Sequence, residues 1–195
     1  ENKPDQLVFV LYTGGGLVEA VERMVDIIRH HYKEVWFIVP DIAMSAGTIF
    51  CMSGDRIYMD YSSALGPIDP QVENSEGRFV PALGYLDRVE KLIKKSKNDE
   101  LTDAEFAMLQ NQDFAELQQY EQAQKLSISL LKKWLVKYKF KNWDTHSSNG
   151  EAVTPEEKSN RAEKIATDLS NHKKWLSHAR MIGIETLTRD LKLKI

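Results

Sequence analysis

The first part of the chain alternates short apolar runs with an amphipathic segment. The continuous apolar runs at 7–12 and 35–39 are typical of strands buried on both faces of a mainly parallel sheet. Between them, apolar residues recur at helical spacing over 17–31 and predict an amphipathic helix. A loosely alternating segment at 56–60 predicts a third strand. This order predicts an α/β fold, with a parallel sheet covered by helices.

Beyond about residue 80 the pattern becomes helical and charged. Helical spacing or N-terminal capping signals predict helices that begin near residues 85, 102, 113, 154, 172 and 185. We therefore expect an α/β catalytic core over residues 1–80. A helical extension over residues 81–195 is expected to pack on this core within one structural domain.

Two connections between a strand and a helix contain the residues of chemical interest. Gly14, Gly15 and Gly16 follow the first strand, and Ser45 lies between the second strand and an apolar helix. Because sites form at the carboxyl ends of parallel strands, both connections are expected at one edge of the sheet. The Ser45 hydroxyl and the Ala46 N–H would lie at a helix N-terminus, which favours an oxyanion. The alternative is that Ser45 is only a helix cap and the glycines only a tight turn.

Composition and motif spacing argue against several classes of function. The chain has 26 Lys and Arg against 29 Asp and Glu, a net charge of −3, which argues against nucleic acid as a partner. The glycines lack the spacing of phosphate or dinucleotide motifs, so we expect no cofactor. The His30-His31 pair has no further ligands nearby, so we expect no metal. The single cysteine, Cys51, fits a reducing, cytoplasmic compartment. No apolar run reaches about 18 residues, so membrane association would require a segment upstream of Glu1.

The order of these segments resembles the Clp protease/crotonase superfamily. Within it the chain is most similar to the serine dehydrogenase proteinase family, which is related to signal peptide peptidase A. The resemblance covers roughly residues 7–71 and is carried by Thr13–Gly16, Met44–Thr48 and Leu65–Gln71. It implies a β-β-α spiral core with a helical C-terminal extension.

The resemblance also implies an activity. It implies a serine peptidase that cleaves a peptide or protein substrate through an acyl-enzyme on Ser45. The oxyanion hole would come from the N–H of Gly15 or Gly16 together with that of Ala46. It further implies homo-oligomers, which the aromatic residues near the end of the long helix also favour: Trp134, Tyr138 and Phe140. The alternatives are a catalytically silent scaffold or peptide-binding protein of the same fold and, with less support, a crotonase-like acyl-CoA enzyme.

The general base is where the chain departs from its relatives. Clp proteases place a histidine soon after the third strand, but this chain has none between His31 and His146. Signal peptide peptidase A uses a lysine, and none is present near 81–83. The candidates are His178, a lysine within 91–97, or a residue of another subunit or of an upstream segment. His178 is preferred because an imidazole acts near neutral pH without a large pKa shift.

One acidic residue could assist the base. Asp69 could orient a base, although a role in the turn before Pro70 is favoured.

Overall fold

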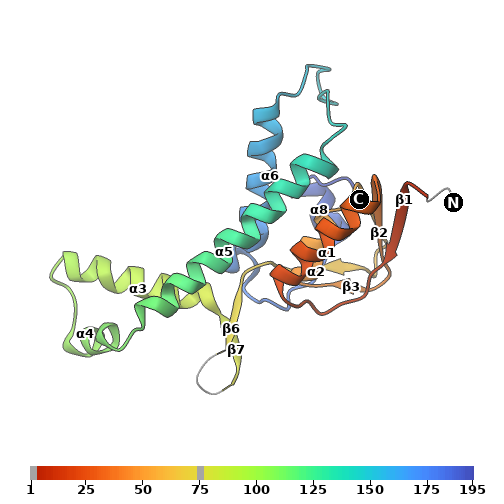
Figure 1. Ribbon diagram of the computed structural model, residues 1–195. Coiled ribbons are helices and arrows are strands. Elements are labelled where there is room, and N and C mark those ends of the chain that lie inside the picture. Colours follow the sequence, from red (N-terminus) through yellow and green to blue (C-terminus); the bar gives the residue numbers. More distant parts are fainter. Residues whose placement is uncertain (1–3, 74–76) are drawn as a thin grey trace. The chain divides into compact units, whose positions relative to one another are not determined.

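The computed structural model describes residues 4–73 and 77–195 (Figure 1). The chain forms two compact units, one made of residues 1–68 with 127–195 and the other of residues 69–126. Within the first unit, the C-terminal segment returns to pair with an earlier strand, since Ile182 and Gly183 are antiparallel to Ala64 and Leu65.

The first unit is a mixed α/β structure with small sheets. Its elements are β1 (Gln6–Val10), α1 (Val18–His31), β2 (Glu34–Val39), β3 (Ile42–Ala43), α2 (Ala46–Met52), β4 (Arg56–Met59), β5 (Ala64–Leu65), the end of α5 (Phe114–Trp134), the π-helical turn η1 (Leu135–Lys139), α6 (Pro155–Ser170), α7 (His172–Trp175), β8 (Ile182–Gly183) and α8 (Ile184–Arg189). Strands β1, β2 and β4 are neighbours in one parallel sheet. The expected α/β class and the parallel pairing of the three predicted strands are therefore confirmed.

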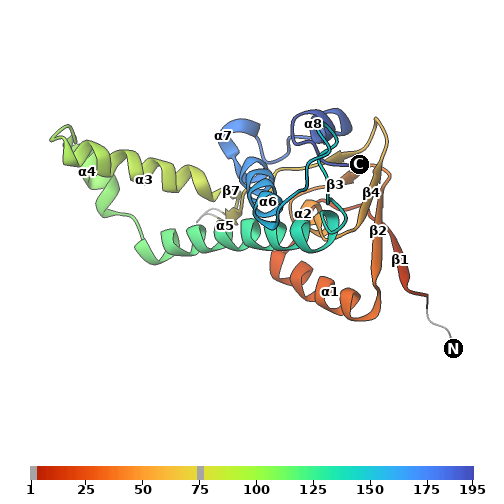
Figure 2. The same ribbon diagram turned by 90° about the horizontal axis from the view of Figure 1, so that it is seen from above.

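The parallel sheet is buried on one face only, which corrects the expectation of two buried faces. Phe37 of β2 points into the core and is fully buried, whereas its neighbour Ile38 is 38% exposed. Val8 and Val10 of β1 and Tyr58 of β4 are also exposed. Figure 2 shows α1 and α2 on the same side of β1 and β2. Apolar side chains therefore line the outer face of this sheet.

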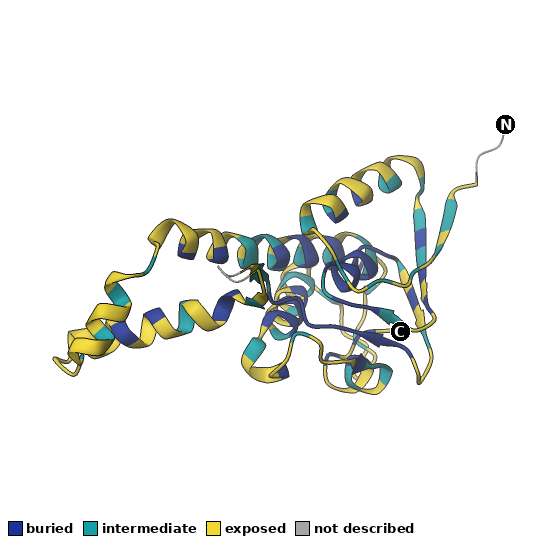
Figure 3. Cartoon of the chain, turned by 90° about the horizontal axis from the view of Figure 1, so that it is seen from below, coloured by how far each residue is buried: buried dark blue, intermediate teal, exposed yellow. Residues whose placement is uncertain are grey.

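Helix α2 forms the centre of the first unit. Every residue from Ala46 to Met52 is buried, because this helix is apolar on all sides (Figure 3). The Phe50 ring packs edge-on against Phe37 of β2, with centroids 4.8 Å apart. Burying a helix on all sides fixes its position, and its first turn therefore provides a rigid location for a functional residue.

A second small sheet, in the order β3-β5-β8, lies within the same unit. Strand β3 is parallel to β5, and β5 is antiparallel to β8. These two-residue strands were not predicted, because two residues are too few for a hydrophobic period. The expected helix from 172 to 180 ends at Trp175, since Leu176 adopts a left-handed conformation with φ 64°.

The aromatic residues at the end of α5 pack within the molecule. Trp134 and Phe140 are buried, and Tyr138 lies under the Arg29 guanidinium, 3.7 Å from carbon to ring centroid. The argument that these three side chains form an intersubunit surface is therefore wrong.

The second unit is a hairpin followed by helices. It contains β6 (Gln71–Glu73), β7 (Phe79–Pro81), α3 (Ala82–Lys97), α4 (Asp103–Gln110) and the first part of α5. The two strands are antiparallel. Ala82 and Val89 of α3 pack with Leu117 and Tyr120 of α5 in a small apolar core. The predicted capping box of α4 is confirmed, with the Glu105 N–H donating to Thr102 Oγ1 at 3.2 Å.

Candidate active site around Ser45

Ser45 has an unusual backbone conformation. It follows β3 directly and occupies the N-cap position of α2, with φ 53° and ψ −119°. These angles are those of the first central residue of a type II′ turn, a position that glycine dominates. A non-glycine residue held in such a region stores backbone strain, which is typical of functional sites.

The Ser45 hydroxyl does not cap the helix. Its side chain makes no capping hydrogen bond, in contrast to Thr102 and Thr154, whose hydroxyls accept an N–H at the start of α4 and α6. Ser45 is half-buried. The structure therefore does not support the alternative that Ser45 acts only as a cap.

The glycine turn lies against Ser45. The Thr13 N–H donates to the Ile42 carbonyl, and the Met44 N–H donates to the Thr13 carbonyl, both at 3.0 Å. A Cβ on Gly15 would lie 2.9 Å from the Ser45 Cβ, and Gly15 has φ +117°. The close approach and the positive φ both require glycine at this position.

Three backbone N–H groups were predicted to bind an oxyanion, and their surroundings differ. Ala46 is the first residue of α2, so its N–H has no acceptor within the helix. The Gly15 N–H donates to Thr13 Oγ1 at 3.1 Å. The Gly16 N–H makes no hydrogen bond within the part of the chain that the structure describes. Of the two glycines, Gly16 therefore has the unused donor.

Thr48 holds this arrangement together and was not identified from the sequence. Its buried hydroxyl lies 2.8 Å from the Ala43 carbonyl and 2.9 Å from the Gly66 carbonyl, and it accepts the Gly66 N–H at 2.9 Å. The first turn of α2 is thus tied to β3 and to the residue after β5. The sequence signal was a threonine inside an apolar helix, where a buried hydroxyl needs partners.

The segment that contains His178 approaches the same edge of the second sheet. In the register of this sheet, Ala43 is opposite Leu65 and Leu65 is opposite Ile182. Because β8 is antiparallel to β5, the residues that precede Ile182 lie at the edge where β3 leads into Ser45. His178 is half-buried and lies four residues before Ile182.

The other candidates for the base belong to the second unit. Lys91 and Lys97 are exposed there, while Lys94 and Lys95 form ion pairs with Glu90 and Glu105 of that unit. Asp69, the candidate for orienting a base, also belongs to the second unit. These residues remain candidates on the sequence alone.

Two further features of the described residues concern metal binding and membrane crossing. In residues 4–73 and 77–195, no group of three or more His, Cys, Asp or Glu side chains is arranged to hold a metal ion. None of the helices in these ranges is both long and apolar enough to cross a membrane.

Comparison with known proteins gives one family and two relatives. Residues 1–154 match the model of the ClpP-like SDH-type serine proteinase family. Two uncharacterized proteins of Methanocaldococcus jannaschii are similar: MJ0137 is 40% identical over 72 residues, and MJ1495 is 35% identical over 101 residues.

The aligned segments cover 37% and 52% of this chain, but only 24% and 32% of those two relatives. The chain thus spans about a quarter to a third of the length of the curated relatives it matches. No solved structure matches it. Since the family model covers most of the sequence, this chain belongs to the ClpP-like SDH-type serine proteinase family.

Proposed function

We propose that this protein is a serine peptidase and that Ser45 is its nucleophile. The observation that carries the proposal is the backbone of Ser45, strained at φ 53° at a helix N-terminus, with a hydroxyl that is not used as a cap. Attack of Oγ on a peptide carbonyl would form a tetrahedral oxyanion and then an acyl-enzyme, which water hydrolyses. The amine leaving group would take the proton that Oγ gave to the base.

The oxyanion would be held by the N–H groups of Ala46 and Gly16. Neither N–H has a hydrogen-bond acceptor among the described residues. Ala46 follows Ser45 directly, and Gly16 follows Gly15, which lies against Ser45. In this mechanism the Gly15 N–H, which is bonded to Thr13, fixes the shape of the turn. It can join the oxyanion hole if the Thr13 hydroxyl rotates away. The β-β-α spiral core belongs to the same proposal and is supported by Thr13, which bridges to Ala43 of the second sheet.

His178 is the base in this proposal. The register that brings its segment to the Ser45 edge supports it, and histidine is the side chain that most often acts as a general base. A peptide or protein is the expected substrate, because the family is one of serine proteinases.

Labelling with a fluorophosphonate tests the nucleophile. The wild-type chain should be modified on one serine, and Ser45→Ala should abolish the label. Ser62→Ala is a matched control on an exposed serine and should label like the wild type. A folded wild-type protein that takes no label at any pH between about 6 and 9 would favour the alternative of a silent scaffold.

The base is tested by the rate of the same labelling reaction. His178→Gln should slow it by roughly 10²–10⁴-fold, the usual contribution of a general base. Lys91→Gln is the control, since Lys91 is exposed on its own unit. An unchanged rate in His178→Gln together with a loss in Lys91→Gln would transfer the role to the lysine.

We also propose that the chain forms a homo-oligomer. This proposal is supported by the outer face of the parallel sheet, where four apolar side chains are exposed: Val8, Val10, Ile38 and Tyr58. A contiguous apolar face of this kind usually marks an interaction surface.

A further inference from the structure

A cationic cavity lies in the first unit, apart from Ser45. Its volume is about 580 Å³, within the range of small-molecule sites. Ser45 and the glycine turn are absent from its lining. Helix α2 separates the two places: Ser45 precedes its first residue, and Asp55 of the cavity follows three residues after its last. A seven-residue helix rises about 10 Å, so the cavity is a separate feature.

Positive side chains dominate the cavity wall. Five of them line it: Arg56, Lys139, Arg161, Lys192 and Lys194. Within the described ranges, the three lysines make no hydrogen bond or ion pair with a protein group. Even with the carboxylate of Asp55 counted, positive charge remains in excess among the lining side chains. Clustered like charges repel one another, and an anion bound among them would relieve this repulsion.

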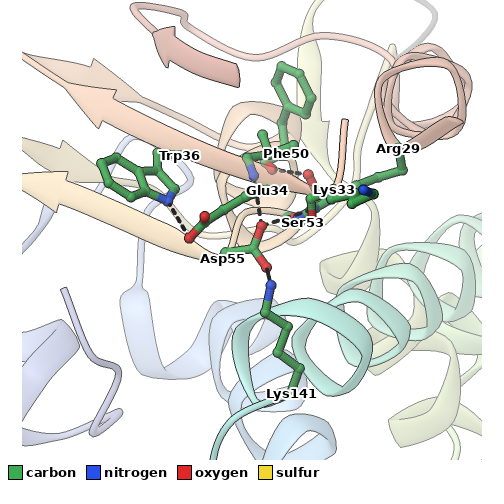
Figure 4. Close-up of polar contacts among 9 residues, drawn as sticks. Arg29, Lys33, Glu34, Trp36, Phe50, Ser53, Asp55 and Lys141 are labelled. Atoms are coloured by element: carbon green, nitrogen blue, oxygen red, sulfur yellow. Dashed lines mark hydrogen bonds and ion pairs between the residues drawn. The ribbon is translucent and has the colours of Figure 1, made fainter. Parts of the chain in front are cut away.

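Asp55, the only acidic side chain among the described residues of the lining, already has cationic partners. Its carboxylate accepts Arg29 Nη1 at 2.8 Å and the Val35 N–H at 2.7 Å, and it also pairs with Lys141 (Figure 4). Burial alone would raise the pKa of Asp55, but Lys141, Val35 and Arg29 together hold it below its usual value. Asp55 is therefore ionised at neutral pH. Its negative charge is balanced by Arg29 and Lys141, neither of which lines the cavity.

Lys139 is the most distinctive of the cavity lysines. Burial of its amine, together with the neighbouring Lys194 and Arg56, lowers its pKa to about 8 against the opposing effects of Cys51 and Asp55. A bound anion would stabilise the ammonium form that these neighbours disfavour.

The rest of the wall is suited to a planar or apolar group. Tyr58, Phe140 and Trp143 line the cavity together with Ile57. Phe140 and Trp143 are in edge-to-face contact, with ring centroids 5.5 Å apart. Aromatic side chains next to cations provide a stacking surface for a ring and charge for a phosphate.

We propose that this cavity binds a small organic phosphate of nucleotide size, with its phosphate at Lys139 and Lys194 and its ring against the aromatic side chains. Calorimetric titration of the whole chain with ADP, inorganic phosphate and adenosine tests this. ADP should bind most tightly, inorganic phosphate more weakly, and adenosine most weakly, because it has the ring but lacks the charge.

Substitutions localise the binding. Lys194→Gln should weaken ADP binding by about tenfold, as expected for the loss of a charge-assisted contact. Lys194 is exposed, so this change should not affect folding. Lys164→Gln, on the exposed side of α6 and outside the cavity, should have no effect. Ser45→Ala should also bind ADP normally, so the result is independent of the proposed peptidase activity.

Four results would overturn the proposal. They are the absence of ADP binding at millimolar concentration, equal binding of adenosine and ADP, equal binding of inorganic phosphate and ADP, and equal losses in Lys194→Gln and Lys164→Gln.

Discussion

The contact between Gly15 and Ser45 leads to a sharp prediction for Gly15→Ala. An alanine Cβ there would lie 2.9 Å from the Ser45 Cβ and 3.2 Å from the Met44 carbonyl oxygen. Neither neighbour is a flexible side-chain end, so the backbone must shift. The change also places a side chain at φ +117°, a region that only glycine tolerates well.

These two effects set the magnitude. A left-handed backbone costs a non-glycine residue about 1–2 kcal/mol, and overpacking in a tight region adds about 1–3 kcal/mol. We therefore expect Gly15→Ala to lower the free energy of unfolding by roughly 2–5 kcal/mol. Gly14→Ala is the matched control. It lies in the same turn, where a Cβ meets no atom within 4 Å, and its effect should stay within about 0.5 kcal/mol.

Tryptophan fluorescence in a urea titration is the suitable assay. All four tryptophans, at positions 36, 134, 143 and 175, belong to the first unit, so the signal reports the unfolding of the unit that contains Ser45. If Gly14→Ala and Gly15→Ala shift the transition equally, the close packing of the turn on Ser45 is not real. In the fraction that remains folded, Gly15→Ala should also slow fluorophosphonate labelling, because Ser45 must move.

Four further changes test other parts of the structure. Asp55→Ala should destabilise the protein by roughly 3–5 kcal/mol in denaturant titrations, because it leaves a buried cation unpaired. Since the folded-state pKa of Asp55 is lowered, its contribution should persist above pH 3.8 and disappear as the pH falls further, and the variant should lack this acid-dependent loss. Lys139 releases its proton near pH 8 in the folded state and near 10.5 when unfolded, so wild-type stability should rise between these values by up to about 3 kcal/mol. In Lys139→Met this rise should be absent, and an identical pH profile would contradict the burial of the amine. Ile38→Glu should shift a homo-oligomer towards monomers in light scattering, whereas a wild-type protein that is already monomeric at micromolar concentration refutes the oligomer. Ser45→Gly should stabilise the protein by about 1 kcal/mol in thermal unfolding while abolishing the label, and a destabilised variant would show that the serine backbone is not strained.

The sequence was most informative where hydrophobic periodicity extends over several residues. The strands at Gln6–Val10 and Glu34–Val39 and the helix at Val18–His31 were predicted within one or two residues. The burial of both sheet faces was predicted wrongly because β1 and β2 are apolar on both faces, and a continuous apolar run does not reveal which face is covered. The outer face stays exposed in a single chain.

Contacts between distant segments account for most of what the sequence missed. Strand β8 forms only because β5 provides a partner, and two residues such as Ile182 and Gly183 have no strand signal of their own. The role of Thr48 likewise depends on Gly66, which is 18 residues away. The cationic cavity is lined by side chains from β4, η1 and the C-terminal segment, so no local sequence motif predicts it.

The strain at Ser45 bears on whether the site is active or silent. Near φ 53° and ψ −119°, glycine would relieve the strain, and a position that served only to turn the chain would be more stable with glycine. The surrounding structure nevertheless holds a serine in this conformation. The hydrogen bonds of Thr48 fix the first turn of α2, and Thr13 packs closely against the same turn. A Cβ added to Gly47 would lie only 2.4 Å from Thr13 Cγ2. This approach requires glycine at position 47, directly after the helix donor at Ala46. Small residues thus occupy the positions that bring backbone close, while the strained position itself carries a hydroxyl. A scaffold that only binds peptides needs the small residues but not the strained serine, and this difference favours a nucleophile at Ser45.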